Sequence, residues 1–117
     1  MAGLTTHILD TANGVPAAGV TIEIIKVTDD RRIKLRTVKT NVDGRTDTPI
    51  LSGDQCVPGS YEMIFHIGAY FRSRKVNPDP SSFLDKVPIR FTISSEEEHY
   101  HVPLLTSPWS YSTYRGS

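Results

Sequence analysis

The chain has 117 residues, of which 38% are hydrophobic and 22% are charged, and its 13 basic residues balance its 13 acidic ones. This length predicts one domain, residues 1–117, with a core that needs no cross-links. The zero net charge argues against nucleic acid or a membrane surface as a partner, and the single cysteine, Cys56, excludes an internal disulfide.

The first half of the chain predicts one strand followed by a hairpin. Residues 4–10 form a β-prone run that stops before the turn dipeptide Asn13-Gly14. Residues 20–28 alternate between the two faces of a strand. The polar residues 29–32 predict a turn, after which residues 33–40 return as the second strand of the hairpin.

The second half predicts further short strands and one helix. Residues 41–60, with three glycines and two prolines, form a long irregular connection with one short strand near residues 48–51. The segments that follow are a strand (61–68), the one helix (68–75), a proline-punctuated loop (77–82), a strand (87–94), an acidic turn (95–98), a strand (99–105) and a last strand (109–115). Seven or eight short strands with one short helix indicate an all-β antiparallel sandwich.

Three of the four histidines are candidates for chemistry. His7 shares a predicted strand face with Thr5 and Leu9, and His99 and His101 lie two residues apart, so that both face one side. Histidine exchanges protons near neutral pH, but His7 also fits a half-buried strand histidine bonded to a carbonyl. The same spacing suits zinc, although a single cysteine and scattered acidic residues offer few further ligands.

Arg45 follows Asp43-Gly44 inside the long connection. An arginine in that setting is either a solvated loop residue or a planar cation that polarises a carbonyl or holds an anionic ring. The pattern by itself leaves both interpretations open.

The last four residues, Tyr114-Arg115-Gly116-Ser117, are dense in functional groups for a chain end, which is normally frayed. The segment fits a last strand of alternating aromatic and hydroxyl side chains. It also fits a binding site, because its polar end and carboxylate would be costly to bury in a core without partners.

Four segments carry a resemblance to a known family: Leu-Thr-Thr-His-Ile-Leu-Asp (4–10), Asn-Val-Asp-Gly-Arg (41–45), Tyr-His-Val-Pro-Leu-Leu (100–105) and Tyr-Arg-Gly-Ser (114–117). Over nearly its whole length the sequence resembles the transthyretin-like proteins that act as 5-hydroxyisourate hydrolases. The resemblance implies a transthyretin-like β-sandwich, a homotetramer with sites where subunits meet, and hydrolysis of the cyclic amide of 5-hydroxyisourate to 2-oxo-4-hydroxy-4-carboxy-5-ureidoimidazoline in urate degradation.

The resemblance also implies which residues act. The catalytic residues it implies are His7, Arg45, His101 and Ser117. The substrate-binding residues it implies are His7, Arg45, Tyr114 and Arg115. His99 is then a solvated neighbour of the site, and the implied chemistry requires neither a metal nor an organic cofactor.

Two alternatives belong to other functional classes. The transthyretin carrier, which binds a small hydrophobic ligand in a central channel, resembles this chain at residues 104–108 and 110–113. An apolar channel has no use for two imidazoles and Tyr-Arg-Gly-Ser, so these residues favour the enzyme. A zinc-dependent amidohydrolase built on His7, His99 and His101 ranks below both.

The first residues contain neither the basic nor the apolar segment of a secretion signal, and the sequence does not end in Ser-Lys-Leu. No apolar run approaches the length of a membrane-spanning helix. We therefore expect a cytoplasmic protein.

Overall fold

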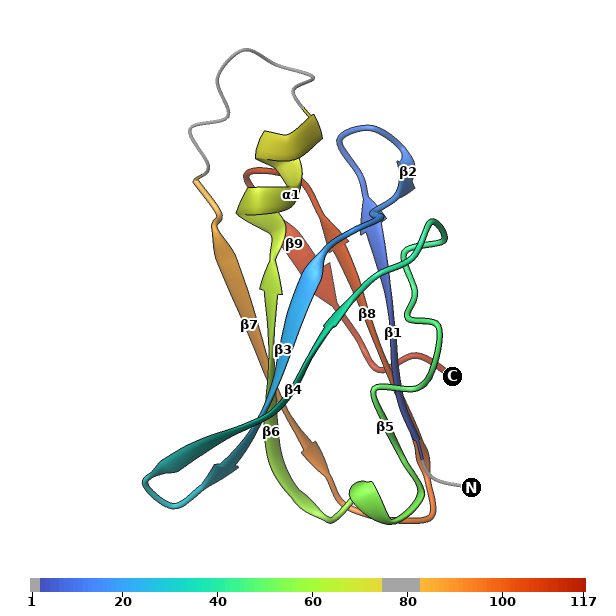
Figure 1. The fold of residues 1–117 in the computed structure, drawn as a ribbon, viewed down its shortest axis with the longest axis vertical. Coiled ribbons are helices and arrows are strands. Elements are labelled where there is room, and N and C mark those ends of the chain that lie inside the picture. The colour runs from blue at the N-terminus through green and yellow to red at the C-terminus, as the bar shows by residue number, and fades with distance from the viewer. Residues whose placement is uncertain (1–2, 75–82) are drawn as a thin grey trace.

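The computed structural model of the protein describes residues 3–74 and 83–117, which form two β-sheets packed against each other (Figure 1). Sheet A contains β2, β1, β8 and β9 in that order, with β5 also paired to β1, and sheet B contains β4, β3, β6 and β7. The strands are β1 (Gly3–Asp10), β2 (Val15–Pro16), β3 (Thr21–Thr28), β4 (Arg31–Lys39), β5 (Leu51–Ser52), β6 (Gly59–His66), β7 (Lys86–Ile93), β8 (His99–Thr106) and β9 (Tyr111–Thr113). The α-helix α1 spans Ile67–Arg74, and a 3₁₀ turn, η1, spans Gly53–Gln55.

This arrangement confirms the predicted all-β sandwich with one short α-helix. Of the nine strands in the described residues, β2 and β5 have only two residues each. The longer strands are therefore the ones that the alternating pattern of the sequence predicted.

One strand pair differs from the predicted antiparallel arrangement, because β1 and β8 run parallel. Their register places Thr5 opposite His101 and His7 opposite Pro103. The other strand pairs in the described residues are antiparallel. Alternation predicts the face that a side chain takes but not the direction of the neighbouring strand, so the sequence pattern did not reveal this pair.

The core lies between the two sheets and determines which side chains remain for their outer faces. Leu4 and Ile8 of β1 and Leu104 of β8 are fully buried. Because successive side chains of a strand point to opposite faces, His7 on β1 and His101 on β8 point away from this core. Both imidazoles are only partly buried.

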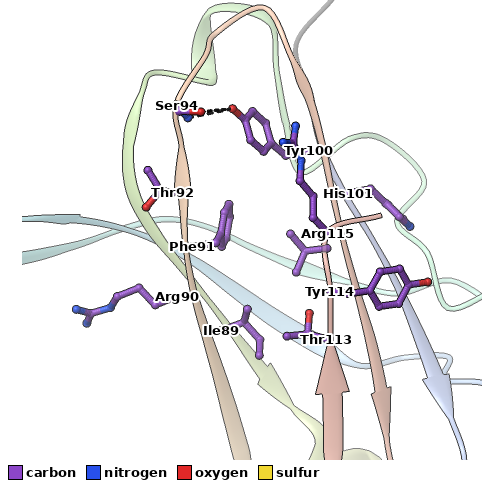
Figure 2. Close-up of a pocket in the computed structure, with 11 residues that line it drawn as sticks. Ile89, Arg90, Phe91, Thr92, Ser94, Tyr100, His101, Thr113, Tyr114 and Arg115 are labelled. Atoms are coloured by element: carbon purple, nitrogen blue, oxygen red, sulfur yellow. Dashed lines mark hydrogen bonds between the residues drawn. The ribbon is translucent and has the colours of Figure 1, made fainter. Parts of the chain in front are cut away.

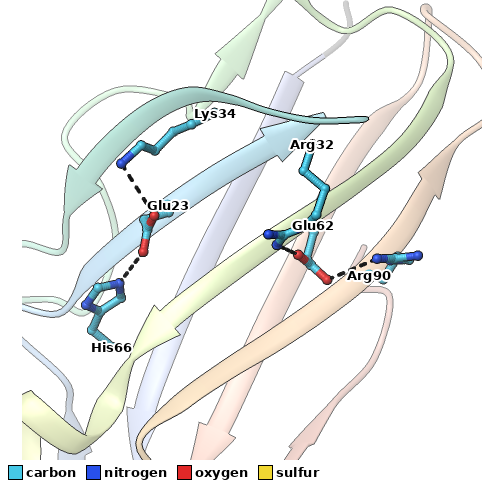
Figure 3. A network of polar contacts seen from close by, with 6 residues as sticks. All are labelled: Glu23, Arg32, Lys34, Glu62, His66 and Arg90. Atoms are coloured by element: carbon cyan, nitrogen blue, oxygen red, sulfur yellow. Dashed lines mark hydrogen bonds and ion pairs between the residues drawn. The ribbon is translucent and has the colours of Figure 1, made fainter. Parts of the chain in front are cut away.

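The outer face of sheet B carries two groups of ion pairs (Figure 3). They are Glu23 with His66 and Lys34, and Glu62 with Arg32 and Arg90. In the first group, Nε2 of His66 lies 2.6 Å from Oε2 of Glu23. His66 is therefore a structural partner in sheet B and lies on a different sheet from the other three histidines.

Several predicted boundaries shift by a few residues. The turn between β3 and β4 contains only Asp29 and Asp30, so residues 31 and 32, predicted as turn, belong to β4. The short strand predicted near residues 48–51 is β5, at Leu51–Ser52, which overlaps that range at its last residue. The helix starts one residue earlier than predicted; residue 75 and the predicted loop 77–82 lie outside the described residues.

The last strand, β9, is shorter than predicted at both ends. Residues 107–110 form a turn in which the amides of Trp109 and Ser110 donate to Oγ of Ser107, at 3.2 and 3.1 Å. Because these amides are satisfied locally, they do not join the sheet. After β9 the chain leaves the sheet and returns to it at a single bridge between Gly116 and His101.

Candidate active site

His7 and His101 are held on neighbouring strands in the middle of sheet A. The parallel register puts Thr5 opposite His101, with His7 two residues further along β1 on the same face. The two imidazoles are near enough for the charge of His7 to influence the pKa of His101. Rigid strands therefore hold two proton-exchanging groups close together.

Arg45 reaches this face on a loop that packs against β1. The side-chain oxygen of Asn41 accepts hydrogen bonds from the amides of Asp43 (2.9 Å) and Arg45 (3.2 Å). The carbonyl of Gly44 accepts from the amide of Ile8 (2.8 Å). Gly44 has a φ of 75°, and a Cβ there would lie 2.5 Å from the carbonyl oxygen of Ile8, so this close approach requires glycine.

The charge of Arg45 acts on both histidines. Burial, followed by the Arg45 charge, lowers the pKa of His7, although a hydrogen bond to the backbone of Asp43 and the Asp43 charge oppose the shift. Burial also lowers the pKa of His101, followed by the charges of Arg45, His7 and His99. These effects favour the neutral form of both imidazoles, in which a ring nitrogen can accept a proton.

Thr5 links the two histidines of β8, and sequence reasoning did not identify it as functional. Its Oγ1 lies 2.8 Å from Nδ1 of His101 and 3.0 Å from Nε2 of His99. His99 is exposed, as expected of a solvated neighbour, but it is also hydrogen-bonded. These contacts join residues more than 90 positions apart, so only the pairing of β1 with β8 reveals them.

The end of the chain lies against His101. The amide of Gly116 donates a hydrogen bond of 2.8 Å to the carbonyl of His101. A Cβ on Gly116 would lie 2.5 Å from Cδ2 of the His101 ring, so backbone and ring are in direct contact. Tyr114 and Ser117, on either side of this contact in the sequence, are exposed. Their roles in binding and catalysis stay predictions.

The side chain of Arg115 takes a different direction. Its Nη2 lies 2.9 Å from Oε1 of Glu98, and its guanidinium lies over the ring of Tyr100, 4.5 Å from the centroid. Figure 2 shows Arg115 extending toward Tyr100 while the His101 ring points away. The predicted role of Arg115 in substrate binding also stays a prediction.

Figure 2 also shows that Arg115 borders a pocket at the edge of the sandwich, between β7 and the end of the chain. The pocket has a volume of about 310 Å³. Its lining includes Ile89, Phe91, Tyr100, Val102 and Thr113. Apolar side chains thus form much of the lining, to which His101 and Tyr114 also belong, whereas His7 does not line the pocket.

The described residues contain no group of three or more His, Cys, Asp or Glu side chains arranged to hold a metal ion. Within the described residues, His7, His99 and His101 therefore do not form the ligand cluster that the zinc alternative requires. Instead, the hydroxyl of Thr5 contacts ring nitrogens of both His99 and His101. Within residues 3–74 and 83–117, no helix is long and apolar enough to cross a membrane.

Known proteins match this chain over almost its full length. A family model described as the HIUase/Transthyretin family matches residues 4–116. A protein of Rhizobium meliloti (strain 1021) named 5-hydroxyisourate hydrolase 2 is 55% identical over 115 residues, which cover 97% of this chain and 95% of that protein. The likeness thus spans nearly the whole length of both proteins.

Two solved structures have the same fold. A crystal structure of (S)-allantoin synthase matches 99% of this chain with a TM-score of 0.91 and 43% identity, and the matched part is 44% of that longer protein. The crystal structure of transthyretin from Sparus aurata matches with a TM-score of 0.86 and 27% identity, over 97% of this chain and 96% of that one. Since a family model matches nearly every residue and both fold and sequence agree with these relatives, the chain belongs to the HIUase/Transthyretin family.

Proposed function

We propose that this protein is a hydrolase of 5-hydroxyisourate, the compound in the name of its 55% identical relative. Water adds to the carbonyl carbon of the cyclic amide, the carbon–nitrogen bond breaks, and the released nitrogen takes a proton. The product is 2-oxo-4-hydroxy-4-carboxy-5-ureidoimidazoline. The observation that carries the proposal is that the paired strands β1 and β8 hold His7 and His101, while the loop of Arg45 packs against β1, because the reaction needs a cation beside two proton-exchanging groups.

The two histidines share the roles of base and acid. One neutral imidazole takes a proton from the attacking water, and the other delivers a proton to the leaving nitrogen. Nδ1 of His101 faces Thr5, so Nε2 is the nitrogen of that ring available to the substrate. The lowered pKa of each histidine supports this scheme, because it keeps a neutral base present at pH 7.

Arg45 serves the reaction in two ways. Its guanidinium stabilises the negative charge that develops on the carbonyl oxygen during attack and attracts the anionic substrate. The same positive charge favours the neutral forms of His7 and His101. A single cation therefore prepares the bases and stabilises the intermediate, and this scheme needs no cofactor.

The end of the chain completes the proposed site. Tyr114 holds the substrate, and Ser117 helps to position the water or an imidazole. The contact between Gly116 and His101 supports these two roles. Arg115 contributes to substrate binding if it exchanges its contact with Glu98 for one with the anionic substrate.

We further propose that residues 1–117 form a single domain that works as a homotetramer in the cytoplasm. Three large apolar side chains near the end of the chain support an assembly, because they are largely exposed in the single chain. They are Trp109 (64% exposed), Tyr111 (44%) and Tyr114 (61%). Burying such surface is favourable, and a neighbouring subunit would provide the cover.

The carrier alternative has less support than the hydrolase. The chain is 55% identical to a 5-hydroxyisourate hydrolase and 27% identical to a transthyretin. A carrier of hydrophobic ligands also gains nothing from a guanidinium beside two imidazoles, since these groups favour water over an apolar ligand.

Ultraviolet spectroscopy of freshly prepared 5-hydroxyisourate tests the proposed function. This substrate decays unaided, so the rate must be compared with and without protein. We expect the protein to accelerate the decay in proportion to its concentration. A decay rate that does not depend on the protein would refute the proposal.

A further inference from the structure

We propose that His99 and Thr5 form a proton relay that connects His101 to solvent during turnover. The inference rests on the proposed hydrolase function and adds two residues to it. Thr5 is a positioning residue, which orients the His101 ring and passes protons to it. His99 is the point at which protons enter and leave the relay.

The contacts of the Thr5 hydroxyl carry the inference. Its Oγ1 lies within hydrogen-bond distance of two ring nitrogens, Nδ1 of His101 at 2.8 Å and Nε2 of His99 at 3.0 Å. A hydroxyl has one proton and two lone pairs, so it donates to one nitrogen and accepts from the other. The chain of donors from His99 through Thr5 to His101 is therefore continuous.

The relay also requires one tautomer of His101. When Thr5 donates to Nδ1, the neutral His101 ring carries its own proton on Nε2. Within residues 3–74 and 83–117, Nε2 has no hydrogen-bond partner. In that tautomer, the nitrogen that is left for the substrate carries the proton that His101 can donate.

Exposure gives the relay its direction. His99 is exposed, whereas His101 is partly buried between His7, Arg45 and the end of the chain. The ring of His99 lies against Gly3, where a Cβ would be only 3.1 Å from its Nδ1. His99 is thus both in contact with water and packed against the backbone of β1.

The transfer balances in protons. Protonated His99 gives up the proton on Nε2 to Oγ1 of Thr5, and Thr5 gives its own hydroxyl proton to Nδ1 of His101. The hydroxyl ends with one proton, His99 is neutral, and His101 carries the added charge. His101 then donates from Nε2 to the leaving nitrogen and keeps its proton on Nδ1. His7 releases to solvent the proton that it took from the attacking water, and His99 regains a proton from solvent.

The charges around His101 favour passing the proton onward. Burial, followed by the charge of Arg45 and by the electrostatic influence of His7 and His99, lowers the pKa of His101, so a proton that arrives on His101 is readily given away. Near His99, Glu98 and Arg115 pair with each other at 2.9 Å. The relay therefore leads from solvent to an imidazole that releases its proton readily.

Three threonine variants test the role of the hydroxyl. Thr5→Val keeps the shape of the side chain and removes the hydroxyl, Thr5→Ser restores it, and Thr21→Val is a matched control at a half-buried position in sheet B. We expect Thr5→Val to lower kcat for 5-hydroxyisourate by about tenfold or more, with KM unchanged. Thr5→Ser and Thr21→Val should keep most of the wild-type kcat.

A second experiment tests His99 as the entry point. In a buffer that is a poor proton donor, we expect His99→Ala to have a lower kcat than the wild type. Added imidazole should restore the kcat of this variant, because imidazole in solution replaces the missing proton donor. Thr5→Val should not recover, since its missing hydroxyl lies between His99 and His101. Recovery of neither variant, or of both equally, would overturn the relay.

Nitrogen-15 NMR provides a readout that does not depend on activity. In the wild type, Nδ1 of His101 should show the chemical shift of a hydrogen-bond acceptor. Thr5→Val should change this shift, whereas Thr21→Val should not.

The experiments distinguish failure of the relay from failure of the proposed function. A wild type that leaves 5-hydroxyisourate unaffected would refute the proposed function, and the chemical shift of His101 Nδ1 would then be the test of the hydrogen bond to Thr5. An active wild type whose kcat survives Thr5→Val would refute the relay alone. If Thr5→Val does not fold, the recovery of kcat by His99→Ala with added imidazole tests the relay, and a failure to recover would refute it.

Discussion

Gly116 and His101 are in contact through both backbone and ring. The Gly116 amide donates to the His101 carbonyl at 2.8 Å, and its Cα faces the imidazole so closely that a Cβ would lie 2.5 Å from Cδ2. The end of a chain is normally frayed, but this contact places it beside His101, a residue of the proposed acid–base pair. The absence of a side chain at position 116 is what permits this contact.

Gly116→Ala should therefore lower turnover. The added methyl group must displace either the His101 ring or the end of the chain, and both belong to the proposed site. We expect kcat to fall by about tenfold or more, the scale expected when an acid–base group loses its position. Ser112→Ala, at an exposed position of β9, is the control and should keep its kcat. Wild-type kcat in Gly116→Ala would contradict the proposed role of this contact.

His7→Asn and His101→Asn should each reduce kcat by about 10²–10⁴-fold, the usual contribution of a general acid or base. His66→Asn is the matched control, because His66 pairs with Glu23 on sheet B and should affect stability more than turnover. Thermal melting of all three variants separates folding from catalysis. Near-normal kcat in a folded His7 or His101 variant would remove that residue from the mechanism.

Arg45→Gln should alter the pH dependence as well as the rate. Burial and the Arg45 charge lower the pKa of His7 and His101, so activity in the wild type should fall only below the ordinary histidine value of 6.5. Removal of the charge raises both pKa values, which moves the acid limb of the profile to higher pH. Rate profiles and NMR titration of the histidines measure the shift.

Lys39→Gln removes an exposed positive charge at the end of β4 and serves as the control for Arg45→Gln. Its pH profile should match that of the wild type. An unchanged acid limb in Arg45→Gln would show that the guanidinium does not act on the two imidazoles.

Deletion of residues 114–117 should abolish activity, because it removes the contact with His101 together with Tyr114 and Ser117. The cost in stability should be small, since these residues lie beyond β9. A purification tag after Ser117 should impair turnover more than the same tag at Met1. Equal kcat of the two tagged forms at matched melting temperature would mean that the end of the chain has no part in the site.

Light scattering should report a tetramer in solution, and dilution to monomers should abolish activity. The physical reason is the exposed apolar surface of Trp109, Tyr111 and Tyr114 next to the proposed site. A charged substitution, Tyr111→Glu, should weaken the assembly, whereas Val57→Glu, at an exposed position in the connection before β6, serves as the control. A fully active monomer would contradict the proposed assembly.

Much of the fold follows from alternation along the sequence. The predicted strands of both sheets are present with small shifts at their ends, because a half-buried strand requires an apolar side chain at every second position. Boundaries that depend on local hydrogen bonds were less predictable. The turn at residues 107–110, where Ser107 accepts from two amides, shortened the last strand for this reason.

The sequence also identified the proposed catalytic residues, but through their motifs and not through their geometry. Alternation put His7 on one strand face with Thr5 and Leu9 and put His101 on one face with His99, and the Asn-Val-Asp-Gly-Arg segment singled out Arg45. Each of these side chains by itself also fits a structural role, such as a half-buried strand histidine or a solvated loop arginine. At the level of the sequence, only the family resemblance assigned the three residues to one site.

The tertiary structure alone decided which side chains meet. The parallel pairing of β1 with β8 sets Thr5 opposite His101, and the close approach of Gly116 brings the end of the chain to the same ring, while Arg115 turns toward Tyr100. A period of two residues specifies the face of a strand and contains no information about its neighbour or its direction. Those choices arise from packing between residues far apart in the sequence, which is why the hydroxyl between His99 and His101 became visible only in the folded chain.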